Sequence, residues 1–158
     1  MLLRGINHIV LQVRSLAASD RFYREVLGLE RVGQRQGMWF YKAGGHHHDL
    51  ALVEAGEGAP APGNTGRVRN QGRAETGLFH FCFDVSDESA LAELHRRCRL
   101  AGVPVLGAVD HNIMRAFYVQ DPDGHTVELG VDVPLAEWAD PSNPFAADRP
   151  FDPEGGKQ

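Results

Sequence analysis

An internal repeat constrains the fold of this 158-residue chain more than any other feature of its sequence. The segment 40–52, FYKAGGHHHDLAL, aligns without a gap to the segment 117–129, FYVQDPDGHTVEL, at an offset of 77 residues. His8 and His80 are related by an offset of 72, so loops of slightly different length separate the copies. A repeat of this period predicts two copies of one small module.

Each copy shows the same order of predicted elements. An alternating segment opens each copy, at residues 6–13 and 78–85, and predicts a strand. A helix follows, with apolar residues at helical spacing, and Gly28 or Gly102 stands where its C-cap is expected. Short strands complete each copy. The sequence therefore predicts an α+β fold in which a βαβββ module occurs twice.

The predicted organisation is a single domain over residues 1–133, followed by a tail. Module one covers about 5–54 and module two about 78–131. The intervening segment 55–77 is rich in Gly, Pro, Asn and charge and is predicted to be a linker or surface loop. From residue 134 the repeat pattern stops, and the Pro-rich segment 134–158 predicts an extended C-terminal tail.

Charge and composition exclude several classes of function. The net charge of −5 argues against nucleic-acid binding, because there is no basic stripe to neutralise phosphates. No apolar run approaches the length of about 20 residues that a membrane span needs. Cys82 and Cys98 form no CxxC pair, which argues against a cysteine zinc site or a disulfide framework. We expect a cytoplasmic protein that binds neither nucleic acid nor membrane.

Three side chains at related positions of the two copies are candidate metal ligands: His8, His80 and Glu128. Two histidines and one carboxylate can form a facial triad, which leaves half of an octahedral metal's positions open. Alternation places Glu128 on the face opposite Val127 and Leu129, and a carboxylate in a half-buried strand is costly unless it is paired or bound to a metal.

From about residue 5 to 131 the chain resembles the vicinal oxygen chelate superfamily, which includes glyoxalases, extradiol dioxygenases, fosfomycin-resistance enzymes and bleomycin-resistance proteins. The opening NHIVLQVRSLAASDRFYREVLGLE and the closing DHNIMRAFYVQDPDGHTVEL carry this resemblance. It implies that the modules form a cupped mixed sheet with helices on its outer face. It also implies that His8, His80 and Glu128 bind a metal on the concave face.

The repeat helps to choose among members of the superfamily. Ala51 is the repeat equivalent of Glu128 and cannot coordinate, whereas glyoxalase I-type sites have a fourth ligand there. The segment 46–52, HHHDLAL, looks like a segment of extradiol dioxygenases, and that likeness implies an acid/base role for His48. Tyr118 and His111 match residues that hold the substrate's oxygens in such enzymes.

The resemblance thus implies an Fe(II)-dependent extradiol ring-cleavage dioxygenase that acts on a catechol-type substrate. Mn(II) is the alternative metal, because the same ligands bind it. The partners are a small aromatic diol and dioxygen, and we expect a homodimer. Two alternatives stand beside this interpretation. One is an epoxide-opening or thiol-transfer enzyme of the fosfomycin-resistance kind, which Arg115 would suit. The other is a non-catalytic aromatic drug-binding protein of the bleomycin-resistance kind.

The candidate catalytic residues also have plainer interpretations. The repeat partner of His48 is His125, a predicted turn residue, and that of Tyr118 is Tyr41, a predicted core residue. On a straight strand His48 and Ala51 point to opposite faces, so His48 can act only if the chain bends after Gly44 and Gly45.

Overall fold

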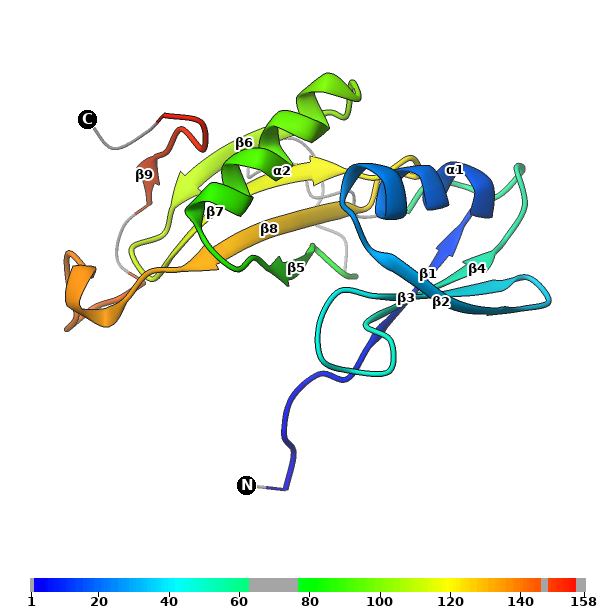
Figure 1. The fold of residues 1–158 in the computed structure, drawn as a ribbon, viewed down its shortest axis with the longest axis horizontal. Helices are drawn as coiled ribbons and strands as arrows, with labels where there is room; N and C mark the ends of the chain where they lie inside the picture. Colours follow the sequence, from blue (N-terminus) through cyan, green and yellow to red (C-terminus); the bar gives the residue numbers. More distant parts are fainter. Residues whose placement is uncertain (1, 63–76, 146–147, 156–158) are drawn as a thin grey trace. The chain divides into compact units, whose positions relative to one another are not determined.

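The computed structural model describes residues 2–62, 77–145 and 148–155 of the chain (Figure 1). The chain folds as two compact units, Met1–Ala61 and Pro62–Gln158, and each is described here by itself. Residues 63–76 of the predicted linker lie outside the described residues. Among the described residues, no helix is long and apolar enough to cross a membrane.

The first unit is a four-stranded mixed sheet with one helical segment. Strand order is β1-β4-β3-β2, with β1 parallel to β4 and the other neighbours antiparallel. The helical segment begins as an α-helix and continues as a π-helix, and the hydroxyl of Ser15 caps its first turn by accepting from the Ala18 amide. The elements are β1 (Ile9–Val13), α1 (Leu16–Asp20), η1 (Arg21–Val26), β2 (Glu30–Arg35), β3 (Met38–Lys42) and β4 (Leu50–Glu54).

The core of the first unit lies between this helical segment and one face of the sheet. Its most buried side chains alternate along the strands or recur on the helix: Leu11, Val13, Phe22, Tyr23, Tyr41, Leu50 and Leu52. The hydroxyl of Tyr41 is satisfied inside this core, because it donates to Asp20 at 3.0 Å. The prediction that Tyr41 is a core residue is confirmed. At the sheet's edge, the Arg31 guanidinium lies 4.5 Å from the ring of Trp39.

The second unit repeats this plan with a longer helix and one extra strand. Strand order is β5-β8-β7-β6-β9, with β5 parallel to β8. Figure 1 shows α2 across one face of this sheet, where Leu91 and Cys98 join Phe117, Val127 and Leu129 in the core. The elements are β5 (Phe81–Asp84), α2 (Glu88–Leu100), β6 (Val105–Asp110), β7 (Met114–Gln120), β8 (Thr126–Asp132), η2 (Leu135–Glu137) and β9 (Arg149–Pro150).

These two mixed sheets with their helices confirm the predicted α+β class. The predicted helix ends are confirmed as well. Gly28 and Gly102 follow the helices with φ of 84° and 69°, a left-handed conformation that favours glycine. His8 and His80 each lie one residue before a strand, β1 and β5, rather than inside one as the alternating pattern predicted. Sheet pairing begins only after each histidine.

The pairing register agrees with the repeat in one place and departs from it in another. Ala51 pairs with Val10 in the first unit as Glu128 pairs with Cys82 in the second, which follows the two sequence offsets. In the hairpins, however, Phe40 faces Ala51, whereas Tyr118 faces Glu128. Phe40 is therefore the structural equivalent of Tyr118, and the prediction that Tyr41 is its equivalent was wrong.

The physical reason for this difference is the length of the connection between the paired strands. One more residue separates Tyr41 from its partner Leu50 than separates Val119 from Val127. A gapless comparison of sequences does not reveal this slip, because both segments contain the same Phe-Tyr dipeptide. Shifting a strand by one residue turns every side chain to the opposite face.

The segment predicted as a C-terminal tail folds back on the second unit. A short 3-10 helix, η2, follows β8, and the indole Nε1 of Trp138 donates to the Val133 carbonyl at 2.8 Å. Further on, β9 pairs antiparallel with β6 at the edge of the sheet. The tail thus becomes part of the second unit's structure.

Candidate metal centre

Two of the three predicted metal ligands meet in the second unit. Nε2 of His80 lies 3.0 Å from Oε2 of Glu128, and the Glu128 side chain is almost fully buried. Two ligand atoms about 2.1 Å from one metal ion and at right angles around it are about 3 Å apart. The separation of these atoms therefore fits a pair of ligands on one metal, and a buried carboxylate beside an imidazole is chemically suited to Fe(II) or Mn(II).

Tyr118 extends from β7 to the second oxygen of this carboxylate. Its hydroxyl donates to Oε1 of Glu128 at 2.7 Å, and its ring contacts that of His80 edge-on at a centroid distance of 5.5 Å. Burial raises the pKa of Tyr118, and the hydrogen bond to Glu128 raises it further. The phenol therefore stays protonated and acts as a hydrogen-bond donor beside the ligand pair.

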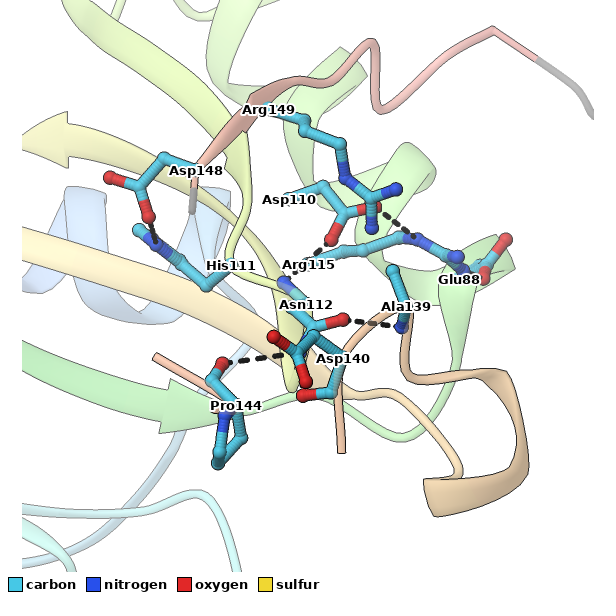
Figure 2. Close-up of polar contacts among 10 residues, drawn as sticks. All are labelled: Glu88, Asp110, His111, Asn112, Arg115, Ala139, Asp140, Pro144, Asp148 and Arg149. Atoms are coloured by element: carbon cyan, nitrogen blue, oxygen red, sulfur yellow. Dashed lines mark hydrogen bonds and ion pairs between the residues drawn. The ribbon is translucent and has the colours of Figure 1, made fainter. Parts of the chain in front are cut away.

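His111 adds a second ring to this network. It lies in the turn between β6 and β7, and its Nε2 is 2.8 Å from the Tyr118 hydroxyl. Its Nδ1 is 2.7 Å from a carboxylate oxygen of Asp148, as Figure 2 shows. The structure therefore brings four sequence-predicted residues of the second unit together, in the order His111, Tyr118, Glu128 and His80.

The first unit holds the remaining predicted residues, His8 and His48. Their rings contact each other at a centroid distance of 4.5 Å, and His48 also lies edge-on to Phe40 at 5.2 Å. The chain bends through residues 43–47, so the condition for His48 to reach this face is met. The predicted acid/base therefore lies beside a predicted metal ligand, and Phe40, the structural equivalent of Tyr118, contacts the same His48 ring.

An aspartate holds the histidine-rich loop of residues 43–49 in shape. Oδ2 of Asp49 accepts from the backbone amides of Ala43 and Gly44 at 2.7 and 2.8 Å, and Oδ1 lies 3.2 Å from Nδ1 of His46. His46 is thus a turn residue. In the second unit, Asp121 accepts from the amides of Asp123 and His125 in the same way. The prediction that His125 is a turn residue is confirmed.

His48 is positioned as a neutral imidazole. Desolvation lowers its pKa, and the neighbouring rings of His47 and His8 lower it further. Nδ1 of His47 lies 2.5 Å from Nδ1 of His48, which brings these two groups into direct interaction. A neutral imidazole can accept a proton from a substrate hydroxyl.

The predicted ligand set is divided between the two units, with His8 in the first and His80 and Glu128 in the second. Within the described parts of the chain, no group of three or more His, Cys, Asp or Glu side chains is arranged to hold a metal ion. The pair that does meet fits a metal in distance and chemistry. Sequence reasoning missed Asp148, which reaches the His111 ring only because the tail folds back, and Asn112, the residue of the His111 turn that binds the tail (Figure 2).

Arg115 lies in β7 but is engaged elsewhere. Its guanidinium pairs with Glu88 of α2, and its Nε lies 3.6 Å from Asp110 (Figure 2). Both partners are carboxylates, so the positive charge is already matched. This arrangement argues against the alternative in which Arg115 serves an enzyme of the fosfomycin-resistance kind.

A family model matches residues 5–129 of this chain, and it describes the Glyoxalase/Bleomycin resistance protein/Dioxygenase superfamily. The chain belongs to this superfamily. The match covers both repeated modules and ends just after Glu128. The resemblance stated from the sequence is thereby confirmed.

Several curated members of the superfamily are similar to this chain. A biphenyl-2,3-diol 1,2-dioxygenase of Rhodococcus globerulus is 32% identical, over 80% of this chain and 63% of the relative. A catechol-2,3-dioxygenase of Bacillus subtilis is 30% identical, over 84% and 43%. The metallothiol transferase FosB of Staphylococcus haemolyticus is 28% identical, over 81% and 84%. The chain thus spans about half to two thirds of the two dioxygenases.

Solved structures of the superfamily share the fold. A lactoylglutathione lyase from Agrobacterium tumefaciens is 30% identical with a TM-score of 0.59, and the match covers 83% of this chain and 96% of that one. A glyoxalase/dioxygenase from Nostoc punctiforme has a TM-score of 0.68 at 21% identity, covering 84% and 94%. At 21% identity, the likeness to the Nostoc protein shows only that the fold is shared.

Proposed function

We propose that this superfamily member is an Fe(II)-dependent extradiol dioxygenase that cleaves a catechol-type diol. The observation that carries the proposal is the contact between His48 and His8. It places a titratable imidazole beside a proposed metal ligand, where an acid/base for a metal-bound diol has to be. The similarity to dioxygenases whose names specify aromatic diols supports the same choice.

The proposed metal ligands are His8, His80 and Glu128, with Mn(II) as the alternative to Fe(II). The 3.0 Å separation of His80 and Glu128 and the equivalence of His8 and His80 in the repeat support this set. When bound, the metal supplies adjacent open positions for the diol and dioxygen and makes a coordinated hydroxyl more acidic.

The remaining roles belong to the chain's own side chains. His48, kept neutral by its surroundings, accepts a proton from a diol hydroxyl. Tyr118 is kept protonated by burial and by Glu128, and its one hydrogen turns from Oε1 of Glu128 to a substrate oxygen when the substrate binds. His111 holds the Tyr118 hydroxyl from its other side. These donors and acceptors orient the substrate before any bond is broken.

Two observations favour this proposal over its alternatives. Ala51 is buried opposite Phe40, so the first unit offers no carboxylate of the glyoxalase I type at the position equivalent to Glu128. Arg115, which would suit the fosfomycin-resistance kind, is paired with Glu88 and Asp110. The FosB relative keeps thiol transfer as the second candidate, since it matches over most of its own length.

Oxygen consumption separates these candidates. We expect anaerobically prepared, Fe(II)-loaded protein to consume dioxygen with at least one member of a catechol panel and to release a yellow ring-opened product. His80→Ala, which removes a ligand, should consume none. Turnover of fosfomycin with a thiol by the Mn(II)-loaded protein, without oxygen consumption on any catechol, contradicts the proposal and favours the second candidate. Saturable binding of an aromatic drug without turnover favours the non-catalytic drug-binding alternative.

The homodimer remains a prediction, based on the single-domain size and the Pro-rich C-terminal segment. Light scattering of the metal-loaded protein tests it. A mass that stays at that of one chain, 17.4 kDa, at all concentrations contradicts it.

A further inference from the structure

The turn that carries His111 is anchored to the C-terminal segment by one buried amide. Asn112 adopts a left-handed conformation with φ of 72°, which asparagine tolerates better than most residues. Its Oδ1 accepts from the Ala139 amide at 2.6 Å, and its Nδ2 donates to the carbonyl oxygens of Pro144 at 3.2 Å and Asp140 at 3.4 Å (Figure 2). We call residues 139–145 and 148–150 the C-terminal strap.

A second anchor lies on the other side of His111. Asp110 pairs with Arg149 where β9 adds to β6, and a guanidinium nitrogen of Arg149 lies 3.4 Å from the Asp110 carboxylate. The same carboxylate accepts from the Asn112 amide at 2.8 Å. The strap therefore holds the turn at the residue before His111 and at the residue after it.

Between these anchors, Asp148 faces the ring of His111. A carboxylate oxygen of Asp148 lies 2.7 Å from Nδ1, whereas Nε2 lies 2.8 Å from the Tyr118 hydroxyl. An ionised carboxylate only accepts hydrogen bonds, so the hydrogen of this contact belongs to Nδ1. The contact thus places a hydrogen on Nδ1 and fixes the plane of the ring.

We infer that Asp148 is a positioning residue for His111. The C-terminal strap presents its carboxylate to Nδ1, and this keeps Nε2 directed at Tyr118 and at the substrate oxygens that Tyr118 serves. The inference rests on the proposed function for its catalytic meaning, but its structural content is independent of it. It also lies outside the family match, which ends at residue 129.

The exposure of Asp148 indicates that its contact with His111 contributes little to stability. Its side chain is 67% exposed, and exposed ion pairs contribute little to the free energy of unfolding. The strap is held instead by buried Asn112 and by the pairing of β9 with β6. Removal of the Asp148 carboxylate should therefore release the ring without releasing the strap.

Nuclear magnetic resonance of the imidazole nitrogens tests this inference directly. The full chain is labelled with 15N and studied without metal at about pH 8, where an ordinary imidazole is neutral. We expect Nδ1 of His111 to carry a hydrogen in the wild type, and the ring hydrogen to lie mainly on Nε2 in Asp148→Ala. Asp148→Asn should keep it on Nδ1, because the amide oxygen can accept the same bond. Asp152→Asn, a matched change in the same tail that spares the His111 contact, should change nothing.

Two outcomes decide the matter. A hydrogen that stays on Nδ1 in Asp148→Ala overturns the inference, whatever the enzyme does. If it moves, Fe(II)-loaded Asp148→Ala should lose about 10–100-fold in kcat with little change in KM, the usual effect of losing a partner that orients a site residue. Unchanged kcat with a moved hydrogen contradicts the positioning role in catalysis. Wild-type protein without dioxygenase activity refutes the proposed function, while the nitrogen spectra still decide the structural claim.

Discussion

Both units contain a Phe-Tyr dipeptide in equivalent strands, β3 and β7, but the two units turn different members of it towards the core. In the first unit Tyr41 points into the core and donates to Asp20, while Phe40 contacts His48 on the other face. In the second unit Phe117 is in the core and Tyr118 faces Glu128. A slip of one residue in the hairpin is enough to exchange an apolar ring for a phenol at the site.

This difference teaches that the duplicated modules divide the chemistry. The second unit provides the buried carboxylate and the phenol that bonds to it, whereas the first provides Ala51 and a histidine-rich loop. Both units keep an aspartate, Asp49 or Asp121, that holds the connecting loop. The plan of the module is thus shared, whereas the side chains on the face opposite the core have diverged.

The largest expected effect comes from removing the carboxylate that distinguishes the second unit. Glu128→Ala should lose most bound Fe(II) and all dioxygenase activity, because His80 would keep no ligand partner on its own unit. Metal analysis after anaerobic loading measures the loss. Asp132→Asn, an exposed change on the same strand, is the control and should keep its metal. Full metal occupancy in Glu128→Ala contradicts the assignment.

The next effect concerns the histidine-rich loop of the first unit. His48→Ala should still bind metal and catechol, but its turnover should fall by about 10²–10⁴-fold, the value of a positioned acid or base. His46→Ala and His47→Ala should change turnover far less than His48→Ala does, since His46 contacts Asp49 and His47 acts only as a neighbour of His48. Single-turnover oxygen consumption by the three variants is the measurement. Equal behaviour of all three shows that the loop is only a turn.

A smaller effect tests whether the first unit can be given the second unit's chemistry. Ala51→Glu should lower the free energy of unfolding by several kcal/mol, because it buries a carboxylate opposite Phe40 without a donor. The double change Phe40→Tyr with Ala51→Glu should recover about 1–3 kcal/mol, because the phenol can then donate as Tyr118 does. Urea unfolding measures both. If the effects of the two substitutions on the free energy of unfolding are strictly additive, positions 40 and 51 are not equivalent to positions 118 and 128.

The smallest effect is the pH dependence of the loop that Asp49 holds. Although desolvation opposes it, the amides of Gly44 and Ala43 and the ring of His46 hold the pKa of Asp49 below its ordinary value. A lowered pKa stabilises the fold above the ordinary carboxyl range, and the contribution is lost as pH falls below about 4. Asp49→Asn should therefore cost about 1–3 kcal/mol at neutral pH and less in acid.

Thermal unfolding of both proteins between neutral and acidic pH checks this. For Glu57→Gln, an exposed change in the same unit, the difference in stability from the wild type should not shrink in acid. If the difference in melting temperature between the wild type and Asp49→Asn stays constant with pH, the explanation is contradicted.

Local patterns were sufficient to predict the order of elements, the glycines after both helices and the face of the strand on which Glu128 lies. Each of these follows from alternation or from a conformation that few residues adopt. The gapless repeat could not predict that Phe40, rather than Tyr41, is the structural equivalent of Tyr118, because strand register depends on the whole hairpin. Nor was the contact of Asp148 with His111, 37 residues apart, because it exists only once β9 has paired with β6.

The two tryptophans of the chain make its halves optically distinguishable. Trp39 lies in the first unit under the Arg31 guanidinium, and Trp138 lies in the second, bonded to Val133. Trp39→Phe and Trp138→Phe therefore each leave one fluorophore, which reports on a single half. Emission followed through denaturant shows directly whether the duplicated modules melt in one cooperative step or in succession, and whether binding of a metal couples them.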